Sequence, residues 1–129
     1  MVSSGRQLDQ VLAGLKEEHA DSKVGGVSQS SREVLEHLTD CYMNTVRAAE
    51  GKEPEWGAFT AAGKSWADLQ KAYAESRATA VAAILGTPED KVGDLALNYI
   101  IMHDTYHVGQ LALVRLQTDP SWDAYSIYS

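Results

Sequence analysis

The sequence predicts an all-α protein, specifically an antiparallel four-helix bundle with one long crossover loop. Apolar residues recur at intervals of three and four along four segments of the 129-residue chain, which is the spacing that places them on one side of an α-helix. The sequence has three prolines, so long uninterrupted helices are possible. Helices joined by short loops lie antiparallel, and one longer connection allows a crossover.

We expect residues 1–129 to form one domain, and composition and charge narrow its class. The hydrophobic fraction is 44% and the charged fraction is 22%, which excludes a disordered or collagen-like chain. The net charge of −7 argues against nucleic acid as a partner, because phosphate binding requires an excess of Lys and Arg. The N-terminal residues lack the apolar core of a signal peptide, and no run approaches the ~20 apolar residues of a membrane span. With Cys41 as the single cysteine, an internal disulfide is impossible, so we expect a cytoplasmic protein without a membrane partner.

The first two helices are predicted by their periodicity and by capping boxes. The first is expected from about Gln7 to His19, with Ser4 and Gln7 as its capping box and His19 as a solvated residue at its end. Ser30 and Glu33 form the second capping box, which opens a helix that runs to about Glu50. The inward positions of this second helix are Val34, Leu38, Cys41, Tyr42 and Thr45. His37 lies on the same side, three residues after Val34.

The crossover loop and the third helix follow. Residues 51–64 contain one proline, three glycines and no sustained period, and we expect Trp56 and Phe59 to anchor this loop. A capping box of Ser65 and Asp68 opens the third helix, which continues to Leu85. Its predicted inward side chains are Trp66, Leu69, Tyr73, Ala80 and Ile84.

The last helix begins after Pro88, with Gly93 as a break before the main segment near Asp94, and ends at about Gln117. We expect the aromatic residues of the tail, 118–129, to pack over one end of the bundle. The inward side of this helix consists of Leu95 or Ala96, then Tyr99, Ile100, His103, Tyr106, His107, Gln110, Leu111 and Val114. Two histidines and a glutamine therefore interrupt an otherwise apolar face.

These histidines have the spacing of metal ligands. Side chains four residues apart on a helix are neighbours, so His103 and His107 can bind one ion. His37, on the inward side of another helix, is the candidate third ligand. Three imidazoles leave at least one coordination position open, as in catalytic zinc sites. The alternative is a hydrogen-bonded core network that binds no metal.

Two other kinds of metal site do not fit. A zincin protease requires Glu directly after its first helical His, and that position is Asp104. A ferritin-like di-iron site requires Glu three residues before each ligating His. In this sequence the residues at those positions before His37 and His103 are Val34 and Ile100.

Three neighbouring residues have open roles. Gln110 is either a partner that orients His107 or bound water, or a polar residue hydrogen-bonded between helices. Asp104 is expected to be a solvated surface carboxylate. Cys41 lies one turn after His37 and is a fourth ligand, a reactive thiol or a small buried hydrophobe.

Residues 31–38 read SREVLEHL and residues 103–111 read HDTYHVGQL. These stretches resemble the second-helix and fourth-helix motifs of the DinB-like (DinB/YfiT) metal-binding four-helix bundles, and the likeness spans about residues 28–117. The resemblance implies that His37, His103 and His107 are the metal triad, with nickel, zinc or iron as the ion. Some members of the family are transferases or isomerases that use a low-molecular-weight thiol such as bacillithiol or mycothiol, and many have no established activity.

Two functions from different classes are consistent with these observations. The first is a metal-dependent S-transferase, in which the open position takes the thiol of a cofactor or a water, and the thiolate attacks a small-molecule electrophile. The second is a non-catalytic metal-binding or stress-linked interaction module, a homodimer that retains metal tightly in a pocket closed by bulky side chains.

Overall fold

The computed structural model describes residues 1–26 and 28–129, and within them it is helical without a β-strand. The predicted all-α bundle is confirmed. Four helical rods build it, the last of which consists of three joined segments. The helices are α1 (Val2–Leu12), α2 (Ser31–Ala49), α3 (Trp66–Leu85), α4 (Glu89–Leu95) and α5 (Met102–Thr118).

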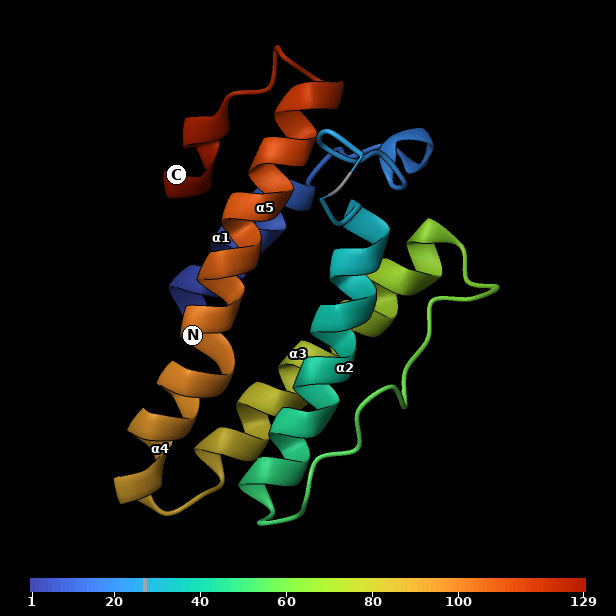
Figure 1. Ribbon diagram of the computed structural model, residues 1–129. Helices are drawn as coiled ribbons and strands as arrows, with labels where there is room; N and C mark the ends of the chain where they lie inside the picture. Colours follow the sequence, from blue (N-terminus) through green and yellow to red (C-terminus); the bar gives the residue numbers. More distant parts are fainter. Residues whose placement is uncertain (27) are drawn as a thin grey trace.

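The crossover loop sets the directions of the helices. It carries the chain from the end of α2 back along the bundle to the start of α3, so α2 and α3 run the same way while α1 and α5 run the opposite way (Figure 1). Arg32 near the start of α2 donates a hydrogen bond to the carbonyl of Lys64 just before α3, at 3.3 Å. Further along, the rings of Tyr42 and Tyr73 lie 6.0 Å apart. The first contact joins the starts of α2 and α3 and the second joins residues further along both helices, as expected for two parallel helices that lie side by side.

Polar side chains of α2 and one aromatic residue of the loop anchor the crossover. The Asp40 carboxylate accepts hydrogen bonds from the backbone N–H groups of Gly57 and Phe59, at 2.9 and 3.1 Å. Asn44 Oδ1 accepts a bond from the Glu55 N–H at 2.6 Å. Phe59 packs against the core, as predicted, whereas the prediction that Trp56 anchors the loop is wrong, because its side chain is 64% exposed. Buried carboxylate and amide acceptors satisfy a loop backbone that has no helical partners of its own.

The capping signals mark two helix starts correctly. The Ser30 hydroxyl accepts a bond from the Glu33 N–H, and the Glu33 carboxylate accepts one from the Ser30 N–H, so the full capping box forms. At α3 the Ser65 hydroxyl accepts from the Asp68 N–H. The return bond from Asp68 does not form, since its side chain is one methylene shorter than Glu.

The first helix differs from its prediction. It begins at Val2 and ends at Leu12, whereas the sequence suggested Gln7 to His19. Ser4 does not cap it, because Ser4 lies inside the helix and its hydroxyl bonds the Asp104 carboxylate at 2.8 Å. Gly14, with a φ of +74°, takes the chain out of the helical direction. His19 therefore ends a separate short 3₁₀ turn, Glu17–His19.

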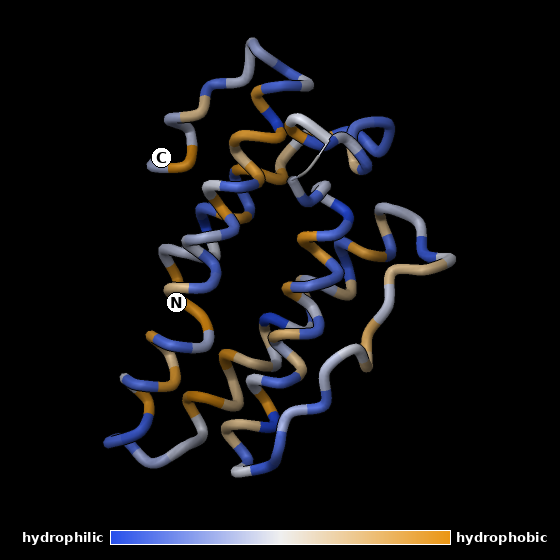
Figure 2. Tube along the Cα trace, in the orientation of Figure 1, coloured by the Kyte–Doolittle hydropathy of each residue, from blue (hydrophilic) through white to orange (hydrophobic). Residues whose placement is uncertain are grey.

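The last rod also differs from its prediction. Gly93 does not break it, because it lies within α4. The irregularity lies one turn later, where Ala96–Ile101 form a π-helical segment between α4 and α5. Apolar positions recur along every rod (Figure 2), and those that point inward make up one core. Its fully buried side chains include Leu8, Leu35, Leu38, Tyr42, Leu69, Ile84, Ile100 and Leu111.

The C-terminal tail packs against this core through Trp122 and Ile127, as predicted for a segment that covers one end of the bundle. Tyr125 and Tyr128 of the same tail stay exposed. Among the described residues, no helix has both the length and the hydropathy that crossing a membrane requires.

Candidate metal centre

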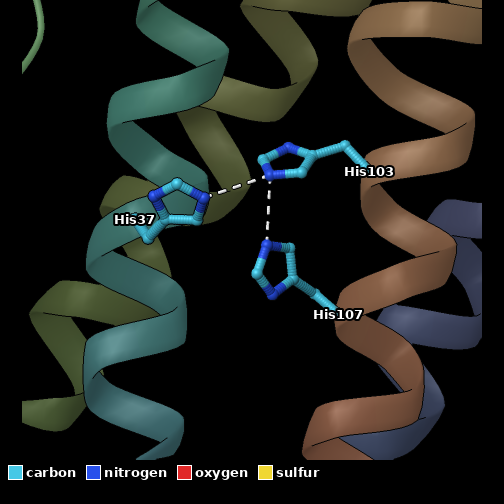
Figure 3. A group of neighbouring side chains, drawn as sticks. All are labelled: His37, His103 and His107. Carbon is cyan, nitrogen blue, oxygen red and sulfur yellow. Dashed lines mark hydrogen bonds between the residues drawn. The ribbon is translucent and has the colours of Figure 1, made fainter. Parts of the chain in front are cut away.

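Three histidines from two helices meet beside the core. His37 comes from α2, and His103 and His107 come from successive turns of α5, with the three rings turned toward one another (Figure 3). The Nε2 atom of His103 lies 3.1 Å from His37 Nε2 and 3.1 Å from His107 Nε2. One ring nitrogen from each residue lies within 4.8 Å of the others. The structure thus brings together the three residues that the sequence analysis selected.

These separations fit a shared cation. A metal bound at 2.0–2.1 Å to two imidazoles holds their nitrogens about 2.9 Å apart at a right angle and about 3.3 Å apart at the tetrahedral angle. The two measured values of 3.1 Å lie between these limits. The third pair, His37 and His107, lies within 4.8 Å, so two of the three pairs have the spacing of imidazole ligands on one ion.

The hydrogen bonds around the cluster leave too few N–H groups for every close pair of ring nitrogens to form a hydrogen bond. His107 Nδ1 lies 2.6 Å from Gln110 Oε1, and because an amide oxygen only accepts, the His107 proton resides on Nδ1. The Nε2 atom of neutral His107 then carries a bare lone pair. His103 Nε2 has either one proton or one lone pair, so it can complete a hydrogen bond with one of its two imidazole neighbours but not with both. A cation accepts lone pairs from all three rings, which a proton network cannot do.

Burial keeps two of the rings neutral. Desolvation and the neighbouring His103 lower the pKa of His107 to about 4. Desolvation, with His37 as a second cause, also lowers the pKa of His103. Neutral imidazole is the form that binds metals, so both side chains are in the ligating form at neutral pH.

A family model described as the DinB superfamily matches residues 2–111. The chain belongs to the DinB superfamily. The match includes α1 through most of α5 and therefore contains all three histidines. No curated protein and no solved structure gives a significant match.

The histidine cluster of this DinB-superfamily chain opens into a cavity of about 470 Å³. His37 and His103 form part of its wall, and the remaining wall is mostly aromatic or thioether. The large apolar side chains that line it are Trp56, Tyr99, Met102 and Tyr106. Tyr99 and Tyr106, which were predicted on the inward side of the last helix, are 43% and 64% exposed and lie in this wall. The cavity has room for a small molecule next to a bound ion.

Cys41 also lines this cavity. Its Sγ atom is 3.6 Å from His37 Nε2 and 3.9 Å from His103 Nε2. The residue is 9% exposed, and desolvation raises the pKa of its thiol to about 12. Without a cation, the side chain is therefore a protonated thiol.

Asp104 corrects one prediction from the sequence, because it is fully buried and not a solvated surface carboxylate. It faces away from the cluster and pairs with Arg77 of α3, whose Nη2 atom lies 2.7 Å from Asp104 Oδ2. Tyr42 of α2 and Ser4 of α1 donate further hydrogen bonds to it, at 2.5 and 2.8 Å. The residue that follows the first metal-site histidine of α5 is thus fixed to three other helices.

The sequence analysis missed Arg77 and Ser4 as partners of Asp104. Arg77 also donates to the Met1 carbonyl at 2.7 Å. One signal was available: Tyr42 was predicted to point inward, Arg77 lies one turn after the inward Tyr73, and Asp104 directly follows the inward His103. Periodicity alone does not show that such polar residues satisfy one another.

Proposed function

We propose that this protein binds one divalent metal ion through His37, His103 and His107. We propose further that the protein is a thiol-dependent S-transferase and that this ion is its cofactor. The observation that supports this proposal is the convergence of three imidazole nitrogens, two of which belong to residues that line an open cavity, His37 and His103. Zinc, nickel and iron all suit three imidazole ligands, and affinity order does not select among them.

The expected chemistry follows from that arrangement. A bound divalent ion lowers the pKa of a coordinated thiol or water to near neutrality and so supplies a nucleophile without a protein base. The thiol belongs to a low-molecular-weight cofactor of the bacillithiol or mycothiol type. Its sulfur forms a bond to an electrophilic carbon, the leaving group departs with its electron pair, and the thiol proton passes to solvent.

Residues of this chain have distinct tasks in that reaction. Neutral His103 and His107 provide lone pairs at neutral pH, and Gln110 holds His107 in the required tautomer. Trp56, Tyr99 and Tyr106 offer aromatic surfaces against which an apolar electrophile can lie.

The non-catalytic alternative fits the cavity less well. A metal-storing or interaction module predicts a pocket filled by bulky side chains, whereas the wall next to His37 and His103 is open. The three rings cannot satisfy one another by hydrogen bonds alone, and this likewise supports metal binding over a metal-free histidine network. Homodimer formation, the absence of a nucleic-acid partner and a cytoplasmic location stay predictions.

Two measurements on protein without an affinity tag test the proposal. Elemental analysis is expected to find about one transition-metal ion per chain, and the variant with His37, His103 and His107 all replaced by alanine is expected to contain almost none. His19→Ala is the matched control, because His19 lies outside the cluster, 3.8 Å from Glu18.

The activity assay combines metal-replete protein with bacillithiol, mycothiol or glutathione and a model electrophile. Turnover above that of the triple-alanine variant is expected with at least one thiol. If all three thiols give no such turnover although the metal is present, the transferase proposal is wrong and the metal-binding proposal stands.

A further inference from the structure

We propose that the Cys41 sulfur is a fourth protein ligand of the ion held by His37, His103 and His107. This inference rests on the proposed metal site and concerns a residue outside the three-histidine set. It turns an all-imidazole site into one with three nitrogens and one sulfur.

Distances to the neighbouring imidazoles are the first argument. A metal bound at about 2.3 Å to sulfur and about 2.05 Å to nitrogen holds the two atoms about 3.6 Å apart at the tetrahedral angle. Cys41 Sγ lies 3.6 Å from His37 Nε2 and 3.9 Å from His103 Nε2. Sγ is also 3.8 Å from His37 Nδ1, so the sulfur lies beside the His37 ring, and a rotation of the Cys41 side chain is needed to bring it to the fourth tetrahedral corner.

The helix spacing is the second argument. Cys41 follows His37 by four residues on α2, as His107 follows His103 by four on α5. Each helix thus presents two potential ligands one turn apart to the same space. Cys41 also lines the cavity into which His37 and His103 face.

The charge of the surrounding side chains is the third argument. His107 is 2% exposed and directs a bare Nε2 lone pair into the cluster. Three neutral imidazoles leave the full double charge of a divalent ion uncompensated. None of the described residues that line the cavity is acidic, so a thiolate is the side chain available there to offset part of that charge.

The binding step conserves charge and protons. The metal–sulfur bond forms as the S–H bond breaks, and the proton passes to solvent, because a coordinating thiol binds as the thiolate. Four protein ligands fill a tetrahedral site, so a cofactor thiol or water enters either as a fifth ligand or by displacing Cys41.

Cobalt(II) binding followed by absorption tests the inference without using activity. Tetrahedral cobalt gives visible ligand-field bands whatever its ligands, whereas a cobalt–thiolate bond adds a charge-transfer band in the near ultraviolet. Because the chain has one cysteine, this band has one source when the reductant is a phosphine and the affinity tag has been removed.

Wild-type protein is expected to show both bands at one cobalt per chain. Cys41→Ser and Cys41→Ala are expected to keep the visible bands, lose the near-ultraviolet band and bind cobalt at least about tenfold more weakly. Two variants are used so that a folding defect in one of them, detected by circular dichroism, does not decide the result.

The outcomes separate the two proposals. Visible bands without the near-ultraviolet band in wild-type protein overturn ligation by Cys41 and leave the histidine site in place. A near-ultraviolet band that survives in both variants also overturns it. If folded wild-type protein shows no cobalt bands at all, the metal site itself is wrong, and ligation by Cys41 fails with it.

Discussion

The ring nitrogen of His107 that points away from the cluster determines what its other nitrogen can do. Gln110 accepts the Nδ1 proton, and the Gln110 amide is itself oriented by a 3.2 Å bond that its Nε2 donates to the Tyr106 hydroxyl. A chain of two hydrogen bonds from an exposed tyrosine thus fixes the tautomer of a buried histidine. Partners of this kind commonly affect metal affinity tenfold to a hundredfold.

Gln110→Leu is therefore expected to weaken metal binding by about ten- to a hundredfold while leaving the fold intact. Competition with a chromophoric chelator measures the dissociation constant. Gln117→Leu, an exposed glutamine on the same helix, is the matched control and is expected to bind like wild type. Equal affinities in the two variants would show that Gln110 does not orient His107.

Metal-free protein is expected to lose stability on acidification because of His107. Its pKa is about 4 in the folded state, below the ordinary value of about 6.5 in the unfolded chain. The unfolded state therefore takes up the proton first, and stability declines as the pH falls from about 6.5 toward 4, by up to roughly 3 kcal/mol.

Urea unfolding of metal-free protein at pH 7.5 and at pH 5 measures this effect. His107→Gln, which cannot titrate, is expected to show a smaller difference between the two pH values than wild type. An undiminished difference in the variant would assign the acid sensitivity to other groups.

Single residues differ in how far the sequence reveals them. His37, His103 and His107 could be selected because four-residue spacing on a helix has one geometric meaning, and Gln110 follows by the same logic. Asp104 could not be placed, since its burial depends on Arg77 of α3 and Ser4 of α1. Partners distant in the chain leave no mark on local periodicity.

At the scale of elements, the start of α2 positions the first histidine. The capping box of Ser30 and Glu33 satisfies two backbone N–H groups that helix geometry leaves without partners. His37 lies two turns further on, so fraying of this helix end would reach it.

Ser30→Ala is expected to destabilise the protein by about 1 kcal/mol, because it removes the side-chain acceptor for the Glu33 N–H. Chemical denaturation followed by circular dichroism measures the change. Ser3→Ala, at an exposed position of α1, is the control and should stay within about 0.5 kcal/mol of wild type. Equal effects of the two substitutions would argue against the cap.

The capping-box motif predicted the helix start correctly at Ser30 and wrongly at Ser4. Both serines precede a Glu or Gln by three residues, but Ser4 lies within a helix that starts at Val2 and bonds Asp104 instead. Likewise, Gly93 marked a break that did not form, whereas the π-helical segment one turn later has no proline or glycine to announce it. Local signals identify candidate helix ends, and tertiary contacts select among them.

At the scale of the whole molecule, the buried Asp104 carboxylate joins all four rods. Arg77 of α3, Tyr42 of α2 and Ser4 of α1 converge on this group of α5. Removing one member of a buried ion pair leaves an uncompensated charge, which typically costs about 3–5 kcal/mol.

Asp104→Asn is therefore expected to destabilise the protein by about 3 kcal/mol or more, as measured by thermal and urea unfolding. Glu75→Gln breaks the exposed ion pair with Lys71 and should change stability by less than about 1 kcal/mol. A similarly small effect at Asp104 would contradict a central role for the buried pair.

Metal is expected to raise the thermal stability of the whole bundle, because His37 and His103 connect α2 to α5 across 66 residues of sequence. Ligand at a hundred times its dissociation constant adds about 2.7 kcal/mol, which corresponds to a rise of roughly 10 °C in Tm for a domain of this size. Scanning calorimetry with and without zinc measures the shift. His103→Ala should abolish it and His19→Ala should not.

The π-helical segment Ala96–Ile101 has a consequence for how insertions and deletions would change the site. A π turn contains about one residue more than an α turn, so removing one residue from this segment would restore an unbroken α-helix. Because the extra residue is accommodated within the π turn, the helix before the deletion would keep its phase relative to His103 and His107, and the change would be confined to the segment itself. Asn98 and Tyr99 lie within this segment and line the cavity, so a one-codon change there would alter the cavity wall without altering the ligands of the ion.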